Sequence, residues 1–161
     1  MDTFSHALWG WGLFGRRHAG LALFFGALPD LVSFAPLLAG RLLMGTWVPG
    51  RPSLATIPGW CFFMYDLAHS AVIAGLAVFL LWRWRRDIGF VACGWLFHIL
   101  LDFPFHSAAY FPTKLFWPLS GWVFDGISWG QPIVWYPNLA GLLLLLGWRW
   151  WQRCQRCQRV R

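Results

Sequence analysis

The sequence predicts an all-α, polytopic membrane protein. Its composition carries two of the observations behind this prediction: 58% of the 161 residues are apolar, and only 12% are charged. A soluble domain carries about 25% charged residues. The third observation is that the apolar residues gather in runs close to the length of about 20 residues that a transmembrane helix needs.

Five apolar segments are expected to form one membrane-embedded helical domain, residues 1 to 148. The first, residues 4 to 15, is short for a span and predicts a short or partly inserted helix. Four longer segments are expected to cross the bilayer: residues 19 to 44, 59 to 82, 88 to 103 and 133 to 148. Pro29 and Pro36 interrupt the first of these, so we expect a broken helix there. Residues 149 to 161 form a basic tail.

The basic residues predict the orientation of the spans, because Lys and Arg collect in cytoplasmic loops. If the spans alternate, one side receives Arg16, Arg17, Arg83, Arg85, Arg86, Arg149, Arg153, Arg156, Arg159 and Arg161. The other side receives Arg41, Arg51 and Lys114. The C-terminus is therefore expected in the cytoplasm, with loops 45 to 58 and 107 to 132 outside. Membrane topology accounts for the net charge of +7, so no nucleic-acid partner is expected.

Ionisable side chains within the apolar runs are the candidate functional residues. An Asp at the bilayer centre costs roughly 2.5 to 3.5 kcal/mol on insertion scales, so such a group is normally paired, faces a wet cavity or binds a ligand. His98 and Asp102 are four residues apart and share one face of a helix. Pro104 is expected to end that helix and to direct His106 toward the same place.

Further ionisable groups are expected to reach the same level of the bilayer. A rise of about 1.5 Å per residue places His69 and His98 near the midplane, with Asp30 at a similar depth. His6 lies in the short first helix. Asp66, three residues before His69, is expected to orient that histidine or to act as a proton shuttle.

These residue types favour a metal site. Imidazole and carboxylate ligands without a thiolate suit zinc, manganese or iron, and zinc is the usual ion for hydrolysis. We predict one or two divalent ions, held by His6, Asp30, His69, His98, Asp102 and His106, with catalytic roles for Asp66 and Asp102. An ion or proton-coupled transporter could use the same cluster, and a non-catalytic membrane scaffold is a third alternative.

Five motifs, in order, resemble a known family: DTFSHALWG, GALPDL, LAHS, HILLDF and LFWPLS. They are similar to the YdjM-like, LexA-regulated family of predicted inner-membrane metal-dependent hydrolases, over residues 2 to about 130. The resemblance implies a multi-pass protein of the bacterial inner membrane with hydrolase activity.

A weaker resemblance is to the helical zinc phospholipase C and single-strand nuclease group, which shares the order His, Asp, His and His-x-x-x-Asp. It implies one metal on Asp30, His69, His98 and Asp102, and a second on His6 and a bridging Asp102. The chain lacks that group's second His-x-x-x-Asp pair, which puts a third metal in doubt. The expected substrate is a lipid phosphoester or ester, because a lipid reaches a site within the bilayer most easily. Lys114 or an outer-loop arginine is expected to attract its headgroup.

Overall fold

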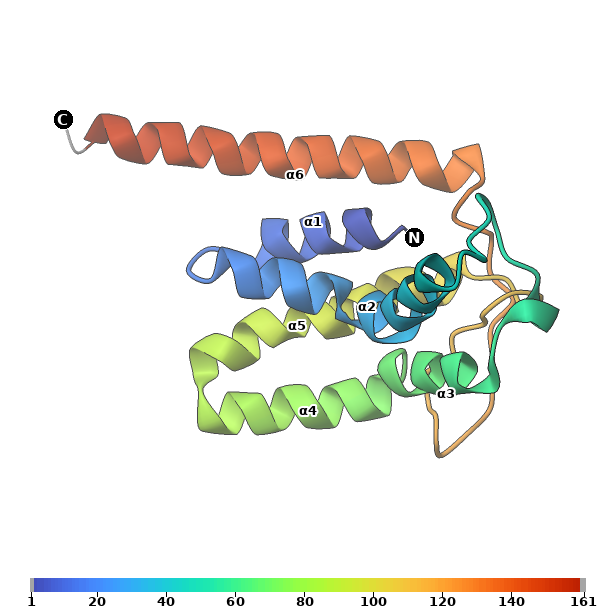
Figure 1. The fold of residues 1–161 in the computed structure, drawn as a ribbon. Helices are drawn as coiled ribbons and strands as arrows, with labels where there is room; N and C mark the ends of the chain where they lie inside the picture. The colour runs from blue at the N-terminus through green and yellow to red at the C-terminus, as the bar shows by residue number, and fades with distance from the viewer. Residues whose placement is uncertain (1, 160–161) are drawn as a thin grey trace.

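The computed structural model describes residues 2 to 159. All regular secondary structure among these residues is helical (Figure 1). The helices are α1 (Thr3–Phe14), α2 (Ala19–Leu43), α3 (Gly59–Ala68), α4 (Ala71–Trp84), α5 (Arg86–Asp102) and α6 (Pro132–Arg159). Two short 3-10 helices, η1 (Leu54–Thr56) and η2 (Phe103–Phe105), lie in the connections. The all-α prediction and the short first helix are confirmed. Arg161 and the side chain of Arg159 lie outside the described residues.

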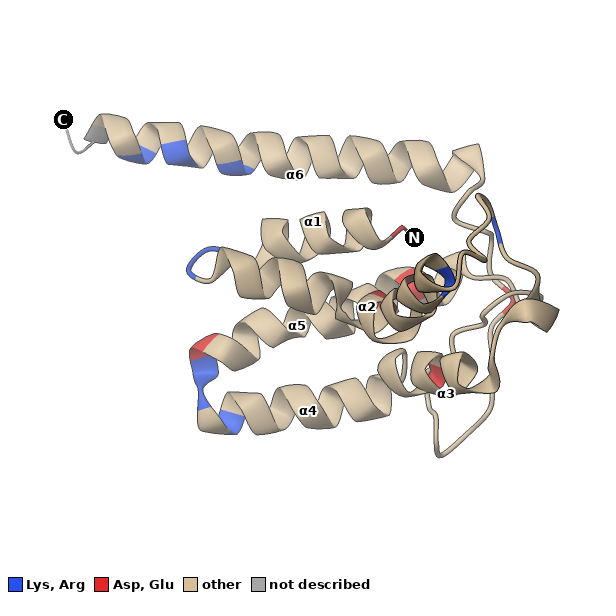
Figure 2. Cartoon of the chain, in the orientation of Figure 1, with Lys and Arg blue, Asp and Glu red and all other residues tan. Residues whose placement is uncertain are grey.

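Helices α2 and α5 lie at the centre of the bundle. Helix α1 packs on both, α3 packs on α2, α4 packs on α5, and α6 runs along α1 (Figure 1). The long connections gather at one end, where the Tyr110 hydroxyl donates a hydrogen bond to the Pro52 carbonyl (3.0 Å). Figure 2 shows that the turns α1–α2 and α4–α5 and the C-terminal half of α6 carry basic residues at the other end. The expected separation of the basic residues is present in the fold.

The described residues contain fewer possible spans than the four expected. Helix α2 and residues 86 to 105 are each long and apolar enough to cross a membrane. Helices α3 and α4 qualify only as a pair, which is bent by 53°. Helix α6 does not qualify, because Asn138 interrupts its apolar run and Arg149 ends it. Both side chains bind α1 instead: Asn138 Oδ1 accepts from the Trp9 indole (2.8 Å), and Arg149 donates to the Gly12 carbonyl (2.9 Å).

The break predicted near Pro29 is absent. Helix α2 continues through Pro29 and Pro36. Proline is tolerated in apolar helices where neighbouring groups satisfy the backbone that it frees. The Ser33 hydroxyl adds a local hydrogen bond to the Pro29 carbonyl (2.7 Å). This continuity keeps Asp30 on a regular helix at the centre of the bundle.

The chain breaks instead within residues 59 to 82, which had been expected to form one continuous span. His69 ends α3, and Ser70 begins α4 by accepting a hydrogen bond from the Ile73 amide (3.3 Å). The Ser70 hydroxyl also donates to the Trp117 carbonyl, in the long connection between α5 and α6. His69 therefore lies at an elbow, supported from outside the helices.

The contact between α1 and α2 depends on Gly26. A Cβ atom at this position would lie 2.5 Å from the His6 carbonyl oxygen, which is closer than side chains approach a backbone. Small residues permit such approaches between apolar helices. The approach allows the His6 ring to stack on His98 of α5, with ring centroids 3.6 Å apart.

Gly26→Ala should therefore destabilise the fold, by about 1 to 3 kcal/mol for an overpacked contact. Gly20→Ala is the matched control on the same helix, since a Cβ there meets nothing within 4 Å. Thermal unfolding in detergent, followed by circular dichroism, should show a lower midpoint for Gly26→Ala alone. Equal midpoints for the two variants would contradict this account of the α1–α2 contact.

Candidate metal centre

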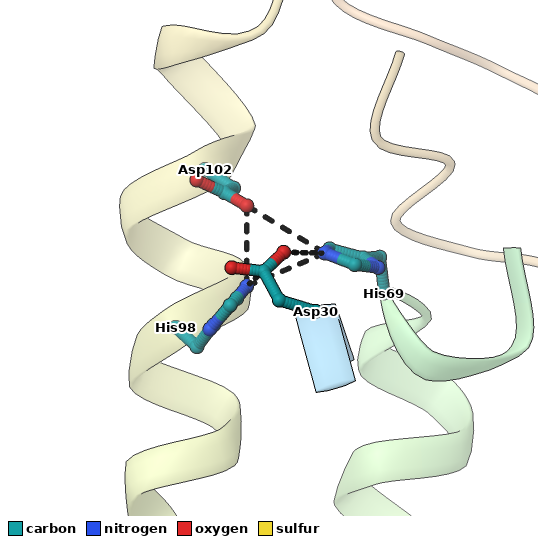
Figure 3. A group of neighbouring side chains, drawn as sticks. All are labelled: Asp30, His69, His98 and Asp102. Atoms are coloured by element: carbon teal, nitrogen blue, oxygen red, sulfur yellow. Dashed lines mark hydrogen bonds and ion pairs between the residues drawn. The ribbon is translucent and has the colours of Figure 1, made fainter. Parts of the chain in front are cut away.

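Four ionisable side chains from three parts of the fold meet inside the bundle (Figure 3). Asp30 comes from α2, His69 from the α3–α4 elbow, and His98 and Asp102 from α5. One ligand atom from each lies within 4.8 Å of those of all the others, and all four residues are buried. These are the groups that counting along the helices placed at one level. The cluster could hold a metal ion.

Hydrogen bonds fix the orientation of both histidine rings. Nδ1 of His69 donates to the Tyr65 carbonyl (3.1 Å), and Nδ1 of His98 donates to the Gly26 carbonyl (2.7 Å). A carbonyl oxygen can only accept, so each neutral ring presents an unprotonated Nε2 to the cluster. Metal-ligating histidines commonly show this arrangement, in which the second ring nitrogen donates to a fixed partner.

The spacing of the inward atoms suits a tetrahedral ion. Nε2 of His98 lies 3.2 Å from Asp102 Oδ2 and 3.3 Å from Nε2 of His69. Nε2 of His69 lies 3.6 Å from Asp102 Oδ2 and 3.7 Å from Asp30 Oδ1. Tetrahedral ligands bound at about 2.0 to 2.2 Å are separated by about 3.3 to 3.6 Å. Nε2 of His98 lies 3.8 Å from Asp30 Oδ1. His69, His98 and Asp102 therefore match the spacing of ligands around one ion, and Asp30 would have to move slightly closer to join them.

The other oxygen of Asp102 faces a second pair of histidines. His6 Nε2 lies 2.8 Å from Asp102 Oδ1, and His106 Nδ1 lies 3.6 Å from the same oxygen. His6 Nδ1 is buried and has no hydrogen-bond partner among the described residues. The distance of 2.8 Å is that of a hydrogen bond, in which His6 Nε2 donates to Asp102 Oδ1. The two oxygens of Asp102 thus face different sets of imidazoles, and a second ion bridged by Asp102 stays a prediction.

Burial also sets the charge of this second pair. It lowers the pKa of His6 to about 4, and it lowers the pKa of His106. Both rings are therefore neutral at pH 7. Nδ1 of His106 donates to the Asp102 carbonyl (3.2 Å), so this nitrogen carries the proton of the neutral ring.

The long connection between α5 and α6 holds His106 in place. The Gly126 amide donates to the His106 carbonyl (2.9 Å), and the Ile127 amide donates to the Pro104 carbonyl (3.0 Å). A Cβ at Gly126 would lie 2.2 Å from the Pro104 oxygen, so only glycine fits this approach. Residues 126 to 129 thus fix the turn that follows α5.

Asp66 does not take the place expected for it beside His69. Its carboxylate pairs with Lys114 (2.7 Å), and the Tyr65 carbonyl makes the hydrogen bond that orients His69. The fold therefore engages Lys114, which had been a candidate for headgroup binding. A proton-shuttle role for Asp66 stays a prediction.

Two supporting residues were missed in the sequence. Thr3 donates a hydrogen bond to Asp30 Oδ2 (2.8 Å), which leaves Oδ1 facing the histidines. Tyr65 stacks on the His69 ring with centroids 3.8 Å apart, in addition to providing its carbonyl. The spacing of four residues between Tyr65 and His69 was a usable signal, whereas nothing local relates Thr3 to Asp30.

A cavity of about 760 Å³ leads to this cluster. Asp30 and His106 line it, together with Thr3 and aromatic residues that include Phe34 and Phe111. The cluster is therefore next to a space large enough for a small molecule or part of a lipid.

Comparison of the chain with models of protein families, with curated proteins and with solved structures finds no match. The family resemblances seen in the motifs stay predictions, and the geometry of the site carries the argument for function.

We expect the protein, purified in detergent without added metal or chelator, to contain one or two divalent ions per chain by elemental analysis. The His98→Ala, Asp102→Asn double variant should lose them, because it removes half of the inward ligand atoms. His18→Ala is the matched control, since His18 pairs with Asp87 outside the cluster. Circular dichroism establishes that each variant is folded. A metal-free wild type that takes up no zinc on titration would contradict the assignment.

Proposed function

We propose that this protein is a membrane-embedded, metal-dependent hydrolase that cleaves a phosphoester or ester bond in a lipid. The observation that carries the proposal is the set of four buried acceptor atoms within 4.8 Å of one another, with the two histidine rings fixed from behind by backbone carbonyls. Two carboxylates balance the charge of one divalent ion. Zinc is our choice of ion, because neutral imidazole and carboxylate ligands without a thiolate suit it.

The chemistry follows from what such a site supplies. A divalent ion bound there polarises a phosphoryl or acyl oxygen and lowers the pKa of a bound water to about 7. The protein's own residues then fix positions. Thr3 holds Asp30 by one oxygen, and the ring stack of His6 on His98 fixes both imidazoles. His6 donates to Asp102 Oδ1 and so leaves Oδ2 facing His69 and His98. A second ion at Asp102 would have to displace this hydrogen bond.

Access to the site supports a lipid as substrate. The candidate spans are α2, the α3–α4 pair and residues 86 to 105, and the cluster lies between them. The adjoining cavity has apolar walls that include Phe34, Leu37 and Leu38. An amphiphile can leave a bilayer for such a cavity without exposing its chain to water. The basic end of the bundle faces the cytoplasm in this proposal, so that the cavity opens toward the opposite side.

A proton-coupled transporter is the rival, and the same acceptor atoms favour it. Two protons shared among Asp30, His69, His98 and Asp102 would balance the two carboxylates as well as one divalent ion does. The rival predicts proton movement across a vesicle membrane without metal, whereas the hydrolase requires metal for turnover.

Hydrolysis of phosphatidic acid and phosphatidylcholine in mixed micelles is the test of this function. We expect turnover that chelator abolishes and zinc restores, and that the His98→Ala, Asp102→Asn variant loses. His18→Ala should keep turnover. If no lipid is cleaved, and chelated protein in vesicles conducts protons in a way that depends on His98, the transporter replaces the hydrolase.

The Asp66→Asn variant distinguishes a proton-shuttle role of Asp66 from a role as a metal ligand. We expect full metal content, because Asp66 pairs with Lys114 and not with the cluster. A shuttle role predicts turnover reduced by about a hundred- to ten-thousandfold with little change in KM. Elemental analysis and steady-state kinetics measure both quantities. Unchanged turnover would restrict Asp66 to its ion pair with Lys114, and Lys114→Met would then behave like it.

A further inference from the structure

The cavity beside the candidate metal centre also reaches two arginines without carboxylate partners. Arg41 and Arg51 line it together with Asp30 and His106. Within residues 2 to 159, the ion pairs that involve arginine or lysine join Arg85 to Asp87 and Lys114 to Asp66, and neither Arg41 nor Arg51 takes part. Two positive charges without a carboxylate ion-pair partner therefore border one cavity, whose acidic lining residues are Asp2 and Asp30.

Uncharged groups hold both guanidinium groups in place. Arg41 Nη2 donates to the carbonyl and hydroxyl oxygens of Thr56, at 3.0 Å each. The Arg51 guanidinium lies over the Tyr110 ring, 3.6 Å from its centroid. These contacts order the side chains and leave their charge uncompensated. Ordered guanidinium groups are well suited to bind phosphate or carboxylate oxygens.

The surroundings of the two arginines change from apolar to polar. The wall between Asp30 and Arg41 on α2 is formed by Phe34, Leu37 and Leu38. A second cavity, of about 430 Å³, shares both arginines and is lined on its polar side by Thr46, Ser53 and Thr56. The arginines thus stand at a boundary that matches the boundary between the chain and the polar group of an amphiphile.

We infer that this cavity binds an anionic amphiphile, with its acidic group on Arg41 and Arg51 and its apolar chain along α2 toward Asp30. The 11 residues from Asp30 to Arg41 rise about 17 Å along the helix. The recognised acidic group therefore lies apart from the cluster, and it is a handle distinct from the bond placed at the metal. That the bound amphiphile is the substrate rests on the proposed function, whereas its binding does not.

Titration of dodecyl phosphate into the full chain, held in phosphatidylcholine nanodiscs, tests the inference. Calorimetry against empty nanodiscs gives the affinity. The Arg41→Gln, Arg51→Gln double variant should bind at least about tenfold more weakly than wild type, because it loses charge-assisted contacts. The Arg17→Gln, Arg85→Gln double variant makes the same change in net charge at the other end of the bundle, and it should bind like wild type.

Two further ligands identify what is recognised. Inorganic phosphate carries the acidic group alone, and dodecyltrimethylammonium carries the chain with the opposite charge. Both should bind much more weakly than dodecyl phosphate. Equal affinity of dodecyl phosphate for the two double variants would overturn the inference. Inorganic phosphate that binds as tightly as dodecyl phosphate would also overturn it, by showing a simple anion site.

Failure of the proposed function can be told apart from failure of this inference. The same titration is made with chelator-treated wild type and with the His98→Ala, Asp102→Asn variant, whose substituted residues do not line the cavity. If binding depends on the arginines in a protein that holds no metal and cleaves no lipid, the inference is supported and the proposed hydrolase function is rejected. If the Arg41→Gln, Arg51→Gln variant hydrolyses lipid with an unchanged KM, the inference is rejected and the proposed hydrolase function stands.

Discussion

The rest of the structure depends on the burial of two carboxylates against the unprotonated inward nitrogens of two neutral imidazoles. The backbone carbonyls of Tyr65 and Gly26 occupy the N–H groups of His69 and His98, so the inward atoms of the cluster are all acceptors. Buried charges of one sign are costly without a compensating cation. A divalent ion, or protons on the inward nitrogens, would lower this cost, which would link the chemistry of the cluster to the stability of the bundle.

Two irregular features of the helices bring imidazoles to this cluster. The chain bends at His69. Because of this bend, the His69 imidazole reaches α5 from a different direction than the side chains of the neighbouring helices do. Helix α1 approaches α2 closely at Gly26, and this brings His6 to the second oxygen of Asp102. Both features interrupt the regular packing of the helices, and both place an imidazole beside the carboxylate of Asp102.

Helix α6 packs along α1 and is not among the helices that are long and apolar enough, by length and composition, to cross a membrane. Asn138 and Arg149, which shorten its apolar run, make hydrogen bonds to α1. Asn138 also donates to Ser5, next to His6 in the chain. The polar residues of α6 thus position the helix that carries His6, and their contribution to the site is indirect.

The two ends of the bundle differ in a way that suits the proposed chemistry. One end carries the basic turns, which are expected to lie in the cytoplasm (Figure 2). The other end carries the cavity, with Asp30 and His106 near the cluster and two arginines farther out. Most basic residues thus lie at one end of the bundle, whereas Arg41 and Arg51 border a ligand-sized space at the other.

The sequence by itself determined the helical class, the uneven distribution of basic residues and the convergence of Asp30, His69, His98 and Asp102, because hydropathy and helical rise fix depth along each segment. Only the tertiary structure decided where the chain breaks, since a proline bends a helix or leaves it continuous according to its neighbours. It also decided that Asp66 pairs with Lys114. Hydrogen bonds and ion pairs between distant segments depend on how helices rotate and approach one another, and local sequence does not encode that packing.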